Sequence, residues 1–313
     1  MLDMKEKPVR ALFVDANDTL AVVTEKLLRD DSLPVGINRN PAIAPDDLPR
    51  LLEGVEIMIV DHTAVLTTIA AKCAALKHVV FLGTGARSYM NPEELSRRGI
   101  AVHTIKGYGD TAVAECAIAL MWASARSFGE MDRGMRAGNW LRRDAVQLTG
   151  KTLGLIGFGG IAAEAARMAL GCSMKVTAWN RRPKEHPGVE FVPLEKLLAE
   201  SHVVSLHLLL NDETKNFLSR ERIAMMRPGA ILINTARGAI VDEEAMIEAL
   251  RSGHIAHAGL DVFTVEPLPV GHPLTKLPNV TLSAHSAFRT PEASDNLIGA
   301  ALDHCRRIIA TGR

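Results

Sequence analysis

The chain has 313 residues, of which 36 are basic and 36 acidic, so its formal net charge is zero before the 11 histidines are counted. Hydrophobic residues make up 47% and charged residues 23%, which excludes a disordered chain and indicates two packed domains or one large one. A neutral chain without a dense basic block is not expected to bind nucleic acid or an anionic membrane. These properties favour chemistry on a small molecule.

The sequence has no run of about 18 apolar residues that could cross a bilayer. Its first seven residues mix charges of both signs, whereas a signal peptide needs a basic end followed by an apolar core. We therefore expect a cytoplasmic protein. Cys73, Cys116, Cys172 and Cys305 show neither CxxC nor metal-ligand spacing, so we expect reduced, mostly buried thiols and no disulfide or metal site.

In the first third of the chain, short β-branched runs alternate with segments of helical periodicity. Four strands are predicted there, at residues 11–14, 57–60, 79–82 and 100–103. Asn91-Pro-Glu-Glu predicts a helix start, because Asn can cap, Pro is tolerated at the first position and acids meet the positive end of the dipole. Gly99 ends that helix. The alternation is typical of a parallel sheet covered by helices, so the fold class is α/β.

A second series of strands begins after residue 150. Six are predicted, at residues 153–156, 176–179, 203–206, 231–234, 257–260 and 280–283, which suits a doubly wound nucleotide-binding fold. Between the two series, residues 111–128 predict a helix too apolar for the surface, so we expect it between domains or across a subunit interface. A last capped helix, residues 290–309, can return to the first domain and make that domain discontinuous.

The segment from Gly157 to Ala162 follows a predicted strand and opens a predicted helix, the context that a dinucleotide-binding fingerprint requires. Gly157 permits the tight turn, Gly159 lets backbone N–H groups approach a pyrophosphate, and Ala162 lets the helix pack on the strand. Without that context, a glycine-rich connector would look the same. The residues expected to bind the dinucleotide are Gly157, Phe158, Gly159, Gly160 and Ile161.

The second strand of such a fold normally leads to an acid that binds the ribose of NAD, but here it leads to Asn180, Arg181 and Arg182. A guanidinium pairs bidentately with a 2′-phosphate, which a carboxylate would repel. The sequence therefore favours NADP over NAD. In the alternative interpretation, both arginines are solvated loop charges and Asn180 hydrogen-bonds the ribose of NAD.

Three later segments, residues 234–238, 259–267 and 279–285, each lie at or just past the end of a predicted strand. Ligands bind at this edge of an open α/β sheet, so Arg237, Glu266 and His285 can converge there. Singly, each has a structural alternative: a helix-capping arginine, a solvated acid or a satisfied buried histidine. Their shared placement favours function. Four other histidines lack such neighbours and are expected to be structural: His62, His103, His207 and His257.

These motifs closely resemble those of the D-isomer-specific 2-hydroxyacid dehydrogenase family, which includes glyoxylate/hydroxypyruvate reductases, phosphoglycerate dehydrogenases and D-lactate dehydrogenases. The resemblance covers nearly the whole chain, including the Gly83-Thr-Gly85 loop and residues 111–115, 226–243 and 277–280. It implies a Rossmann dinucleotide-binding domain, residues 105–287, inserted into a discontinuous flavodoxin-like substrate-binding domain, residues 1–104 and 288–313. It further implies a homodimer built largely on the nucleotide domains.

The resemblance also implies an NAD(P)-dependent oxidoreductase that interconverts a small D-2-hydroxy acid and its 2-oxo acid, with glyoxylate or hydroxypyruvate as substrates. Arg237 would bind the carboxylate and polarised carbonyl, and His285 would be the acid/base. Glu266 would hydrogen-bond the other nitrogen of His285 and favour imidazolium, and Asp261 would hold the nicotinamide carboxamide. Further cofactor contacts are expected from Thr235 and Ala236, and substrate contacts from Thr84, Gly85, Ala86 and Arg87.

Three positions depart from the family's pattern. Arg87 stands after the substrate loop, where acidic or hydroxyl-rich residues are usual, and it meets either a second anionic group of the substrate or only solvent. Leu209 replaces a common proline in the loop over the cofactor, and Ala287 replaces a common glycine, which requires a negative φ. Two alternatives stay open: a phosphoglycerate dehydrogenase-like enzyme that uses Arg87, and a non-catalytic, nucleotide-sensing corepressor-like module.

Overall fold

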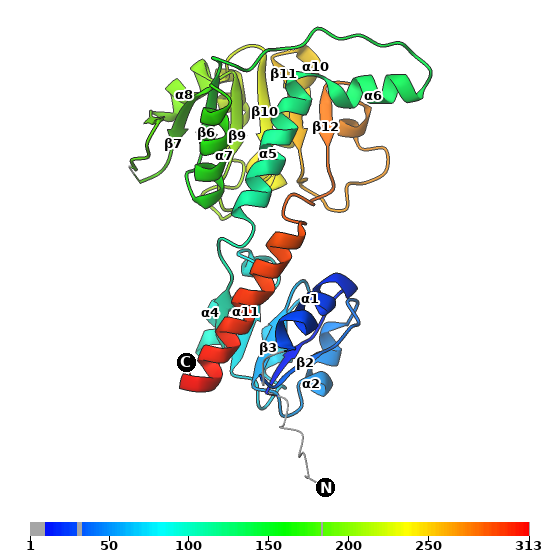
Figure 1. Ribbon diagram of the computed structural model, residues 1–313, viewed down its shortest axis with the longest axis vertical. Coiled ribbons are helices and arrows are strands. Elements are labelled where there is room, and N and C mark those ends of the chain that lie inside the picture. The colour runs from blue at the N-terminus through cyan, green and yellow to red at the C-terminus, as the bar shows by residue number, and fades with distance from the viewer. Residues whose placement is uncertain (1–9, 30–32, 183, 313) are drawn as a thin grey trace. The chain divides into compact units, whose positions relative to one another are not determined.

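The computed structural model describes residues 10–29, 33–182 and 184–312 and divides the chain into two compact units, each built on a parallel sheet (Figure 1). Unit 1 comprises Met1–Gly109 and Thr290–Arg313, and unit 2 comprises Asp110–Arg289. One unit is therefore inserted into the other along the chain. The boundaries expected from the sequence, 104/105 and 287/288, lie within a few residues of these.

Unit 1 contains a five-stranded sheet in the order β2-β1-β3-β4-β5, with every pairing parallel. This is the flavodoxin-like strand order. The strands are β1 (Ala11–Phe13), β2 (Val35–Ile37), β3 (Ile57–Val60), β4 (His78–Phe81) and β5 (Ala101–Thr104). The four strands predicted in this part are confirmed. The sequence analysis missed β2, because three residues around Gly36 are too short and too weakly apolar to show a strand pattern.

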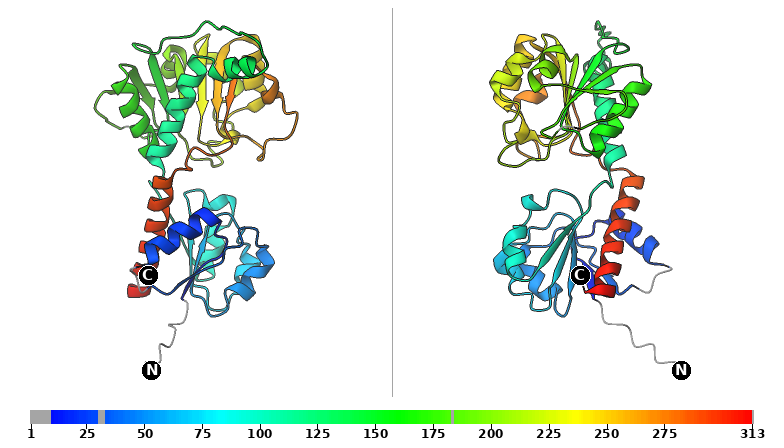
Figure 2. Two further views of the ribbon diagram at one scale, coloured as in Figure 1. Left: turned by 45° about the vertical axis from the view of Figure 1, so that its right-hand side comes forward. Right: turned by 90° about the vertical axis from the view of Figure 1, so that its left-hand side faces the viewer.

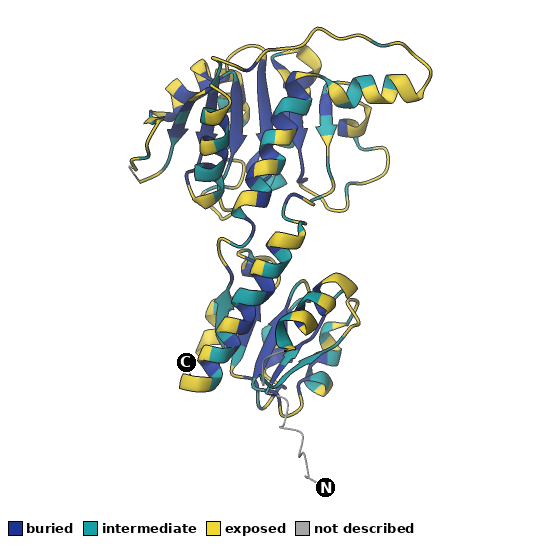
Figure 3. Ribbon diagram, in the orientation of Figure 1, coloured by how far each residue is buried: buried dark blue, intermediate teal, exposed yellow. Residues whose placement is uncertain are grey.

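Alternate residues of the central strand of unit 1 face two different cores. Met58 and Val60 pack in one cluster, while Ile57 and Ile59 pack in another that includes helix α11. The helices are α1 (Asp18–Leu28), η1 (Pro45–Asp47), α2 (Leu48–Leu51), α3 (Thr67–Ala70), η2 (Ala86–Ser88), α4 (Pro92–Arg97) and α11 (Pro291–Thr311). The central strands of both sheets are buried from solvent (Figure 3).

The helix ends of unit 1 follow the predicted capping rules. The Asn91 side chain accepts a hydrogen bond from the backbone nitrogen of Glu94 (3.1 Å) at the start of α4, and Gly99 has φ +80° beyond its end. Thr290 caps α11 in the same way, through the nitrogen of Ala293 (3.1 Å). Because α11 packs in a core of unit 1, the predicted return of the last helix to the first domain is confirmed.

Unit 2 contains a seven-stranded parallel sheet in the order β12-β11-β10-β9-β6-β7-β8, with helices on both faces (Figure 2). The strands are β6 (Thr152–Ile156), β7 (Lys175–Trp179), β8 (Val189–Phe191), β9 (Val203–Leu206), β10 (Ala230–Asn234), β11 (Ile255–Leu260) and β12 (Val280–Leu282). All six predicted strands are confirmed. Only β8 was missed, a three-residue edge strand whose central Glu190 is exposed.

The first strand of unit 2, β6, lies between β7 and β9, so the strand order reverses at the carboxyl end of β6. This reversal is the switch point at which doubly wound sheets bind nucleotides. The helices of unit 2 are α5 (Asp110–Ala125), α6 (Phe128–Arg136), α7 (Gly160–Gly171), α8 (Leu194–Glu200), α9 (Arg220–Met225), η3 (Gly238–Ile240), α10 (Glu243–Ser252) and η4 (Pro273–Lys276).

The long apolar helix is buried largely within its own unit. Helix α5 packs on β10, β11 and α7 of unit 2, so its buried residues belong to that unit's core. A position between domains or at a subunit interface stays a prediction. The close packing of α5 on β11 explains the glycine at position 259, where a Cβ would lie 2.9 Å from the Cβ of Leu120. The helix also ends at Ala125, before the expected residue 128, and Ser127 has φ +51°.

In the part of the chain that the structure describes, no helix is both long and apolar enough to cross a membrane. The cysteines are free thiols: Cys73 and Cys305 are buried and Cys116 is half-buried. Cys172 is exposed, so the expectation of mostly buried thiols is wrong for this residue, which follows the surface end of α7. The described residues contain no group of three or more His, Cys, Asp or Glu side chains arranged to hold a metal.

Candidate active site

The fingerprint loop joins the carboxyl end of β6 to α7, and two of its glycines lie close to other parts of unit 2, Gly157 to main chain and Gly160 to a side chain. Gly157 has φ +87°, and a Cβ there would lie 2.6 Å from the main-chain oxygen of His207. A Cβ on Gly160 would lie 1.7 Å from the Asp110 carboxylate. At Gly159, by contrast, a Cβ would meet nothing within 4 Å. The loop is therefore closely packed against unit 2 at Gly157 and Gly160. At Gly159 it has open space, which a pyrophosphate would need in order to approach the backbone.

The Asn180 side chain ties the fingerprint to the loop that follows β7. Its Oδ1 accepts a hydrogen bond from the backbone nitrogen of Phe158 (3.2 Å), and its Nδ2 donates one to the oxygen of Arg182 (2.8 Å). Arg181 pairs with Glu213, and both side chains are 69% exposed. Such a pair contributes little to stability, so Arg181 can exchange Glu213 for another anion.

Lys184 is a basic residue near the fingerprint that the sequence analysis missed. Its Nζ donates a hydrogen bond to the main-chain oxygen of Phe158 (2.5 Å). The signal was present in the sequence, since Lys184 continues the basic run that begins at Arg181. Three cationic side chains thus follow β7, the strand beside the fingerprint strand.

The Arg237 loop is shaped by Asn234, which the sequence analysis did not single out. Asn234 is buried at the end of β10; its Oδ1 accepts a hydrogen bond from the nitrogen of Ala236 (2.9 Å), and its Nδ2 donates one to the oxygen of Arg237 (2.9 Å). The Thr235 side chain is buried, and its hydroxyl has no hydrogen-bond partner among the described residues. The half-buried Arg237 side chain donates to the oxygen of Ala236 (2.6 Å).

The loop after Arg237 lies directly against the segment that carries Glu266. A Cβ built on Gly238 would lie 2.0 Å from the carbonyl carbon of Phe263, so only glycine permits this approach. The nitrogen of Phe263 donates to Glu266 Oε1 (2.9 Å), which fixes the carboxylate from one side. The structure therefore brings the Arg237 and Glu266 loops together, as their strand-end positions predicted.

Glu266 and His285 form the central pair of the site. Glu266 Oε2 lies 2.6 Å from His285 Nδ1, a hydrogen bond in which the imidazole donates because the carboxylate accepts. The His285 side chain is 37% exposed, and its Nε2 has no hydrogen-bond partner in the described part of the chain. One nitrogen of the ring is thus fixed by the protein, and the other is available to a ligand.

The backbone around His285 explains the departure at Ala287. His285 itself has φ +48°, whereas Ala287 is not among the described residues with positive φ. Alanine at position 287 requires a negative φ, and this requirement is met. The left-handed conformation is adopted by His285 instead.

Asp261 is fully buried at the end of β11 and holds the His285 segment. Its Oδ1 accepts hydrogen bonds from Ser283 Oγ (2.6 Å) and the nitrogen of Ser286 (3.0 Å), and its Oδ2 accepts from the nitrogen of Ala287 (3.0 Å). A role in shaping this loop is thus visible. The contact with a nicotinamide carboxamide stays a prediction.

The predicted substrate loop follows β4 in unit 1. Gly83 has φ +154° and Gly85 has φ −93°, so only the first of them has a backbone conformation that favours glycine. Thr84 is exposed, but the Ala86 side chain is 3% exposed and packs in a core of unit 1, which leaves only its main chain for a ligand. Arg87 pairs with Glu93 on the surface, the arrangement of a surface charge.

The four histidines expected to be structural each have partners within the protein. His103 contacts His78 and His304, and burial lowers the pKa of each of these imidazoles. His207 bonds Ser205 and His257 bonds Thr281, and burial lowers the pKa of His207 and of His257 to about 4. The main-chain oxygen of His207 lies beside the fingerprint, 2.6 Å from a Cβ built on Gly157. The sequence analysis did not predict this contact.

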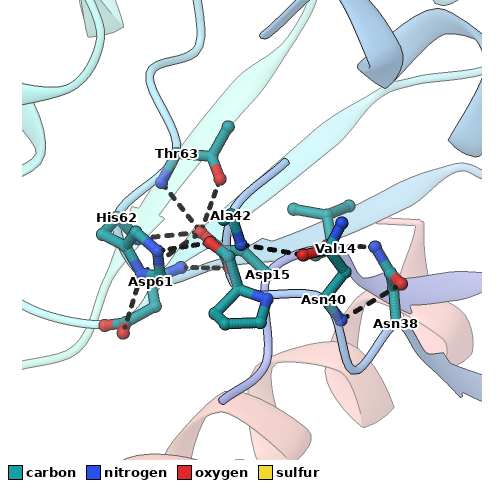
Figure 4. Close-up of polar contacts among 9 residues, drawn as sticks. Val14, Asp15, Asn38, Asn40, Ala42, Asp61, His62 and Thr63 are labelled. Atoms are coloured by element: carbon teal, nitrogen blue, oxygen red, sulfur yellow. Dashed lines mark hydrogen bonds and ion pairs between the residues drawn. The ribbon is translucent and has the colours of Figure 1, made fainter. Parts of the chain in front are cut away.

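The fourth of these histidines, His62, lies in a cluster of acids in unit 1 (Figure 4). Its Nδ1 lies 3.2 Å from Asp61 Oδ2 and 3.7 Å from Asp15 Oδ2, and its Nε2 lies 2.6 Å from the main-chain oxygen of Pro41. The fully buried Asp15 carboxylate accepts hydrogen bonds from the nitrogens of Asp61 (2.9 Å), His62 (2.9 Å) and Thr63 (2.8 Å), so it fixes the backbone of this segment.

Comparison with known proteins agrees with this geometry. The family described as "D-isomer specific 2-hydroxyacid dehydrogenase, NAD binding domain" matches residues 118–287. The chain is 36% identical over 287 residues to a hydroxypyruvate reductase of Thermotoga maritima, covering 90% of this chain and 92% of the relative. The chain belongs to the D-isomer specific 2-hydroxyacid dehydrogenase family.

Other relatives support the same assignment. A glyoxylate reductase of Korarchaeum cryptofilum is 41% identical over 215 residues, which cover 66% of this chain and 65% of that relative, so the match spans somewhat less than two thirds of its length. The crystal structure of the TT0316 protein from Thermus thermophilus superimposes with a TM-score of 0.86 at 34% identity and covers 97% of each chain. This likeness confirms a Rossmann domain combined with a substrate domain. The relatives' names support a dehydrogenase or reductase and do not favour a corepressor.

Proposed function

We propose that this protein reduces small 2-oxo acids to D-2-hydroxy acids with a nicotinamide cofactor, and that glyoxylate and hydroxypyruvate are its substrates. The observation that carries the proposal is the His285–Glu266 pair, joined through Nδ1 at 2.6 Å with Nε2 open to a ligand. It lies at the strand-end edge of a Rossmann sheet, in the same unit as Arg237. Relatives named glyoxylate reductase and hydroxypyruvate reductase give the substrate class.

The reacting groups divide the chemistry among them. Arg237 provides a cation for the substrate carboxylate and for the carbonyl oxygen as charge develops on it. His285 donates a proton from Nε2 to that oxygen, a contribution of about 10²- to 10⁴-fold for a positioned general acid. Glu266 holds the ring by accepting the Nδ1 hydrogen. A bound nicotinamide cofactor would supply the hydride.

The residues present fit a dinucleotide. The open space at Gly159 and the close approach at Gly157 suit a pyrophosphate at the N-terminus of the 12-residue α7. Gly160, Ile161 and the main chain of Phe158 complete that loop. Toward the nicotinamide, the proposed contacts are Thr235, Ala236 and Asp261.

We further propose NADP in preference to NAD. Arg181, Arg182 and Lys184 follow the strand beside the fingerprint, where a carboxylate would mark an NAD site. Arg181 pairs with the exposed Glu213, and a phosphate can easily replace this partner. A phosphate accepts two parallel hydrogen bonds from a guanidinium, which makes the pair strong. In the alternative, Asn180 bonds the ribose of NAD, but both ends of its side chain already bond the protein.

In unit 1, the main chain of residues 83–86 is proposed to bind the substrate carboxylate. Arg87 pairs with Glu93, but their side chains are 72% and 53% exposed, so this pair, like Arg181–Glu213, can be exchanged for another anion and does not exclude a phosphate contact. The phosphoglycerate dehydrogenase alternative is less favoured because the relatives named glyoxylate reductase and hydroxypyruvate reductase, at 41% and 36% identity, are more similar than a D-3-phosphoglycerate dehydrogenase at 33%.

We also propose a homodimer. Helix α6 and the segment that follows it expose apolar side chains on unit 2: Phe128 is 53%, Met135 50% and Trp140 77% exposed. An exposed apolar surface of this kind is typical of an interface, and a second copy is the simplest partner. The cytoplasmic location stays a prediction from the sequence.

The proposed activity is tested by initial rates of NADPH and NADH oxidation with glyoxylate, hydroxypyruvate, pyruvate and phosphohydroxypyruvate. We expect turnover to be fastest with NADPH and one of the first two acids. A protein that binds nucleotide but turns over none of the four would contradict the proposal. Faster turnover with NADH would contradict only the cofactor preference.

A further inference from the structure

Three histidines of unit 1 meet where helix α11 covers the sheet. His78 is the first residue of β4, His103 lies in β5, and His304 lies toward the end of α11. In the parallel register of the two strands, His103 is opposite Val80, two residues after His78, so both histidines are on one face of the sheet. Val80 packs in the core that includes α11, so this is the face that α11 covers.

The hydrogen bonds of the cluster require rings that are not fully protonated. His78 Nδ1 lies 3.2 Å from His103 Nε2, so one of these nitrogens donates and the other must accept without a hydrogen of its own. The His103 ring also faces the ring of His304, with centroids 5.5 Å apart. The guanidinium of Arg307 lies 3.1 Å from His304 Nδ1. Because a guanidinium only donates, this nitrogen accepts and the His304 ring is neutral.

An added proton therefore breaks a contact wherever it binds at these nitrogens. If His78 and His103 were both charged, two N–H groups would face each other across 3.2 Å, and neither could accept. A charged His304 would likewise turn an N–H group toward the guanidinium of Arg307. In both cases two positive charges would also repel each other in a half-buried place.

The surroundings of the cluster do not offer a free carboxylate to balance that charge. Four charged side chains act on the three rings: Glu56, Lys77, Asp303 and Arg307. Both acids already have basic partners, Glu56 in Arg10 and Lys77, and Asp303 in Arg306. Burial is the largest cause that lowers the pKa of each histidine, and the neighbouring rings and Arg307 lower the pKa of His103 further.

The lowered pKa values make the cluster sensitive to acid. Above pH 6.5, the ordinary pKa of histidine, the three rings are neutral in both the folded and the unfolded chain. As the pH falls below 6.5, the unfolded segment takes up protons that the folded cluster does not. The contacts among the three histidines therefore lose stability in acid and keep it at neutral and alkaline pH.

We propose that His78, His103 and His304 form an acid-sensitive latch, which holds the end of α11 on the sheet of unit 1 while the rings are neutral and releases it when they take up protons. The helix is the element that separates, because β4 and β5 are joined by backbone hydrogen bonds, whereas α11 is attached to the sheet through side chains. This latch is a conformational role of unit 1 and is separate from the proposed reaction.

Hydrogen–deuterium exchange of the full chain at pH 7.5 and pH 5.5, corrected for the intrinsic effect of pH on exchange, tests the latch. Residues 303–312 report on the end of α11, and β3, the central strand of unit 1, reports on opening of the whole unit. This local reference is needed because acid also acts on unit 2 through His207 and His257. In the unmodified protein, protection of residues 303–312 should fall about tenfold or more at pH 5.5, and that of β3 less than about threefold.

Two variants remove the titrating groups but keep a side chain that can hydrogen-bond. In His103→Gln and in His304→Gln, the fall in protection of residues 303–312 should be less than about threefold. The matched control is His254→Gln in unit 2, which replaces a half-buried histidine bonded to a main-chain oxygen and should behave like the unmodified protein. Melting temperatures provide a second measure: the difference between His103→Gln and the unmodified protein should shift in favour of the variant as the pH falls from 7.5 to 5.5.

Two results would overturn the inference. The first is an equal fall in protection at β3 and at residues 303–312 of the unmodified protein, which would mean that unit 1 opens as a whole. The second is a fall that persists in both histidine variants, which would mean that other groups sense the acid. If one variant does not fold at pH 7.5, the other provides the same comparison.

Discussion

The main-chain nitrogen of His285 donates a hydrogen bond to the main-chain oxygen of Asp261 (2.8 Å), while the buried carboxylate of Asp261 accepts from the two residues that follow the histidine. The histidine has φ +48°, a conformation that a residue with a side chain adopts only when its surroundings hold it there. The position of the His285 imidazole therefore depends on the buried carboxylate of Asp261, which holds its loop.

Asp261→Asn should destabilise the protein and lower turnover together. An amide in that place turns an NH₂ group toward N–H donors, which leaves a buried donor unpaired at a cost of about 2 kcal/mol. For a unit of this size, that is a fall in melting temperature of about 5 °C. Thermal melting and kcat measure the two effects, with Asp303→Asn on an exposed acid as the control. Normal kcat in a destabilised Asp261→Asn protein would show that the loop needs no such support.

Glu266→Gln should keep the packing of the site but weaken the orientation of His285. Gln retains one oxygen, which can bond either the nitrogen of Phe263 or His285 Nδ1 but not both. We expect kcat to fall about 10- to 100-fold and the pH dependence of kcat to shift, with nucleotide affinity unchanged. Steady-state kinetics from pH 5 to 9 and nucleotide titration check this. An unaltered pH profile would argue that Glu266 does not act through the imidazole.

Replacing Arg181 and Arg182 by alanine should weaken NADPH and spare NADH. Loss of the guanidinium contacts to a 2′-phosphate should lower kcat/KM for NADPH by about tenfold or more, since charge-assisted hydrogen bonds are the strong ones. NADH has no such phosphate, so its kcat/KM should stay within about twofold. Arg50→Ala, on an exposed arginine of unit 1, is the control. Equal losses with both nucleotides would mean that the arginines do not read the phosphate.

The stability contributed by His62 should disappear in alkali. Its hydrogen bond to Asp61 and the charge of Asp15 raise the pKa of His62 from 6.5 to about 9. A raised pKa means that the folded protein holds the proton more tightly than the unfolded chain, so the stabilisation is complete below pH 6.5 and is lost as the pH rises through 9. The melting-temperature difference between the unmodified protein and His62→Gln should be larger at pH 6 than at pH 10. A difference independent of pH would exclude a titrating role.

Much of this fold follows from local sequence signals. Each strand with a clear β-branched run appears in the structure, and capping at Asn91 and Thr290 places the helix starts. The two missed strands, β2 and β8, have three residues each and depend on pairing with a neighbour that local sequence does not reveal. The packing of α5 on the sheet of unit 2 was not predicted, because an apolar helix shows the same sequence pattern in the core of its own domain and at an interface.

The candidate site was predictable where side chains follow strands, and unpredictable where they act through the backbone. Arg237, Glu266 and His285 follow from strand-end placement. The roles of Asn234 and Asp15 depend on which main-chain atoms a buried side chain reaches, which only three-dimensional geometry shows. Of the partners of His62, only Asp61 is adjacent in the sequence, whereas Asp15 and Pro41 are distant and become visible only in the structure.

The central claim is that a 2-oxo acid is reduced with His285 as the proton donor. It is tested most directly by the rate of hydroxypyruvate-dependent NADPH oxidation in the unmodified protein and in His285→Asn, with NADPH affinity measured for both. The account predicts turnover by the unmodified protein, a loss of about 10²-fold or more in the variant, and equal NADPH affinity. Equal rates in the two proteins, or no oxidation by the unmodified protein, would contradict it.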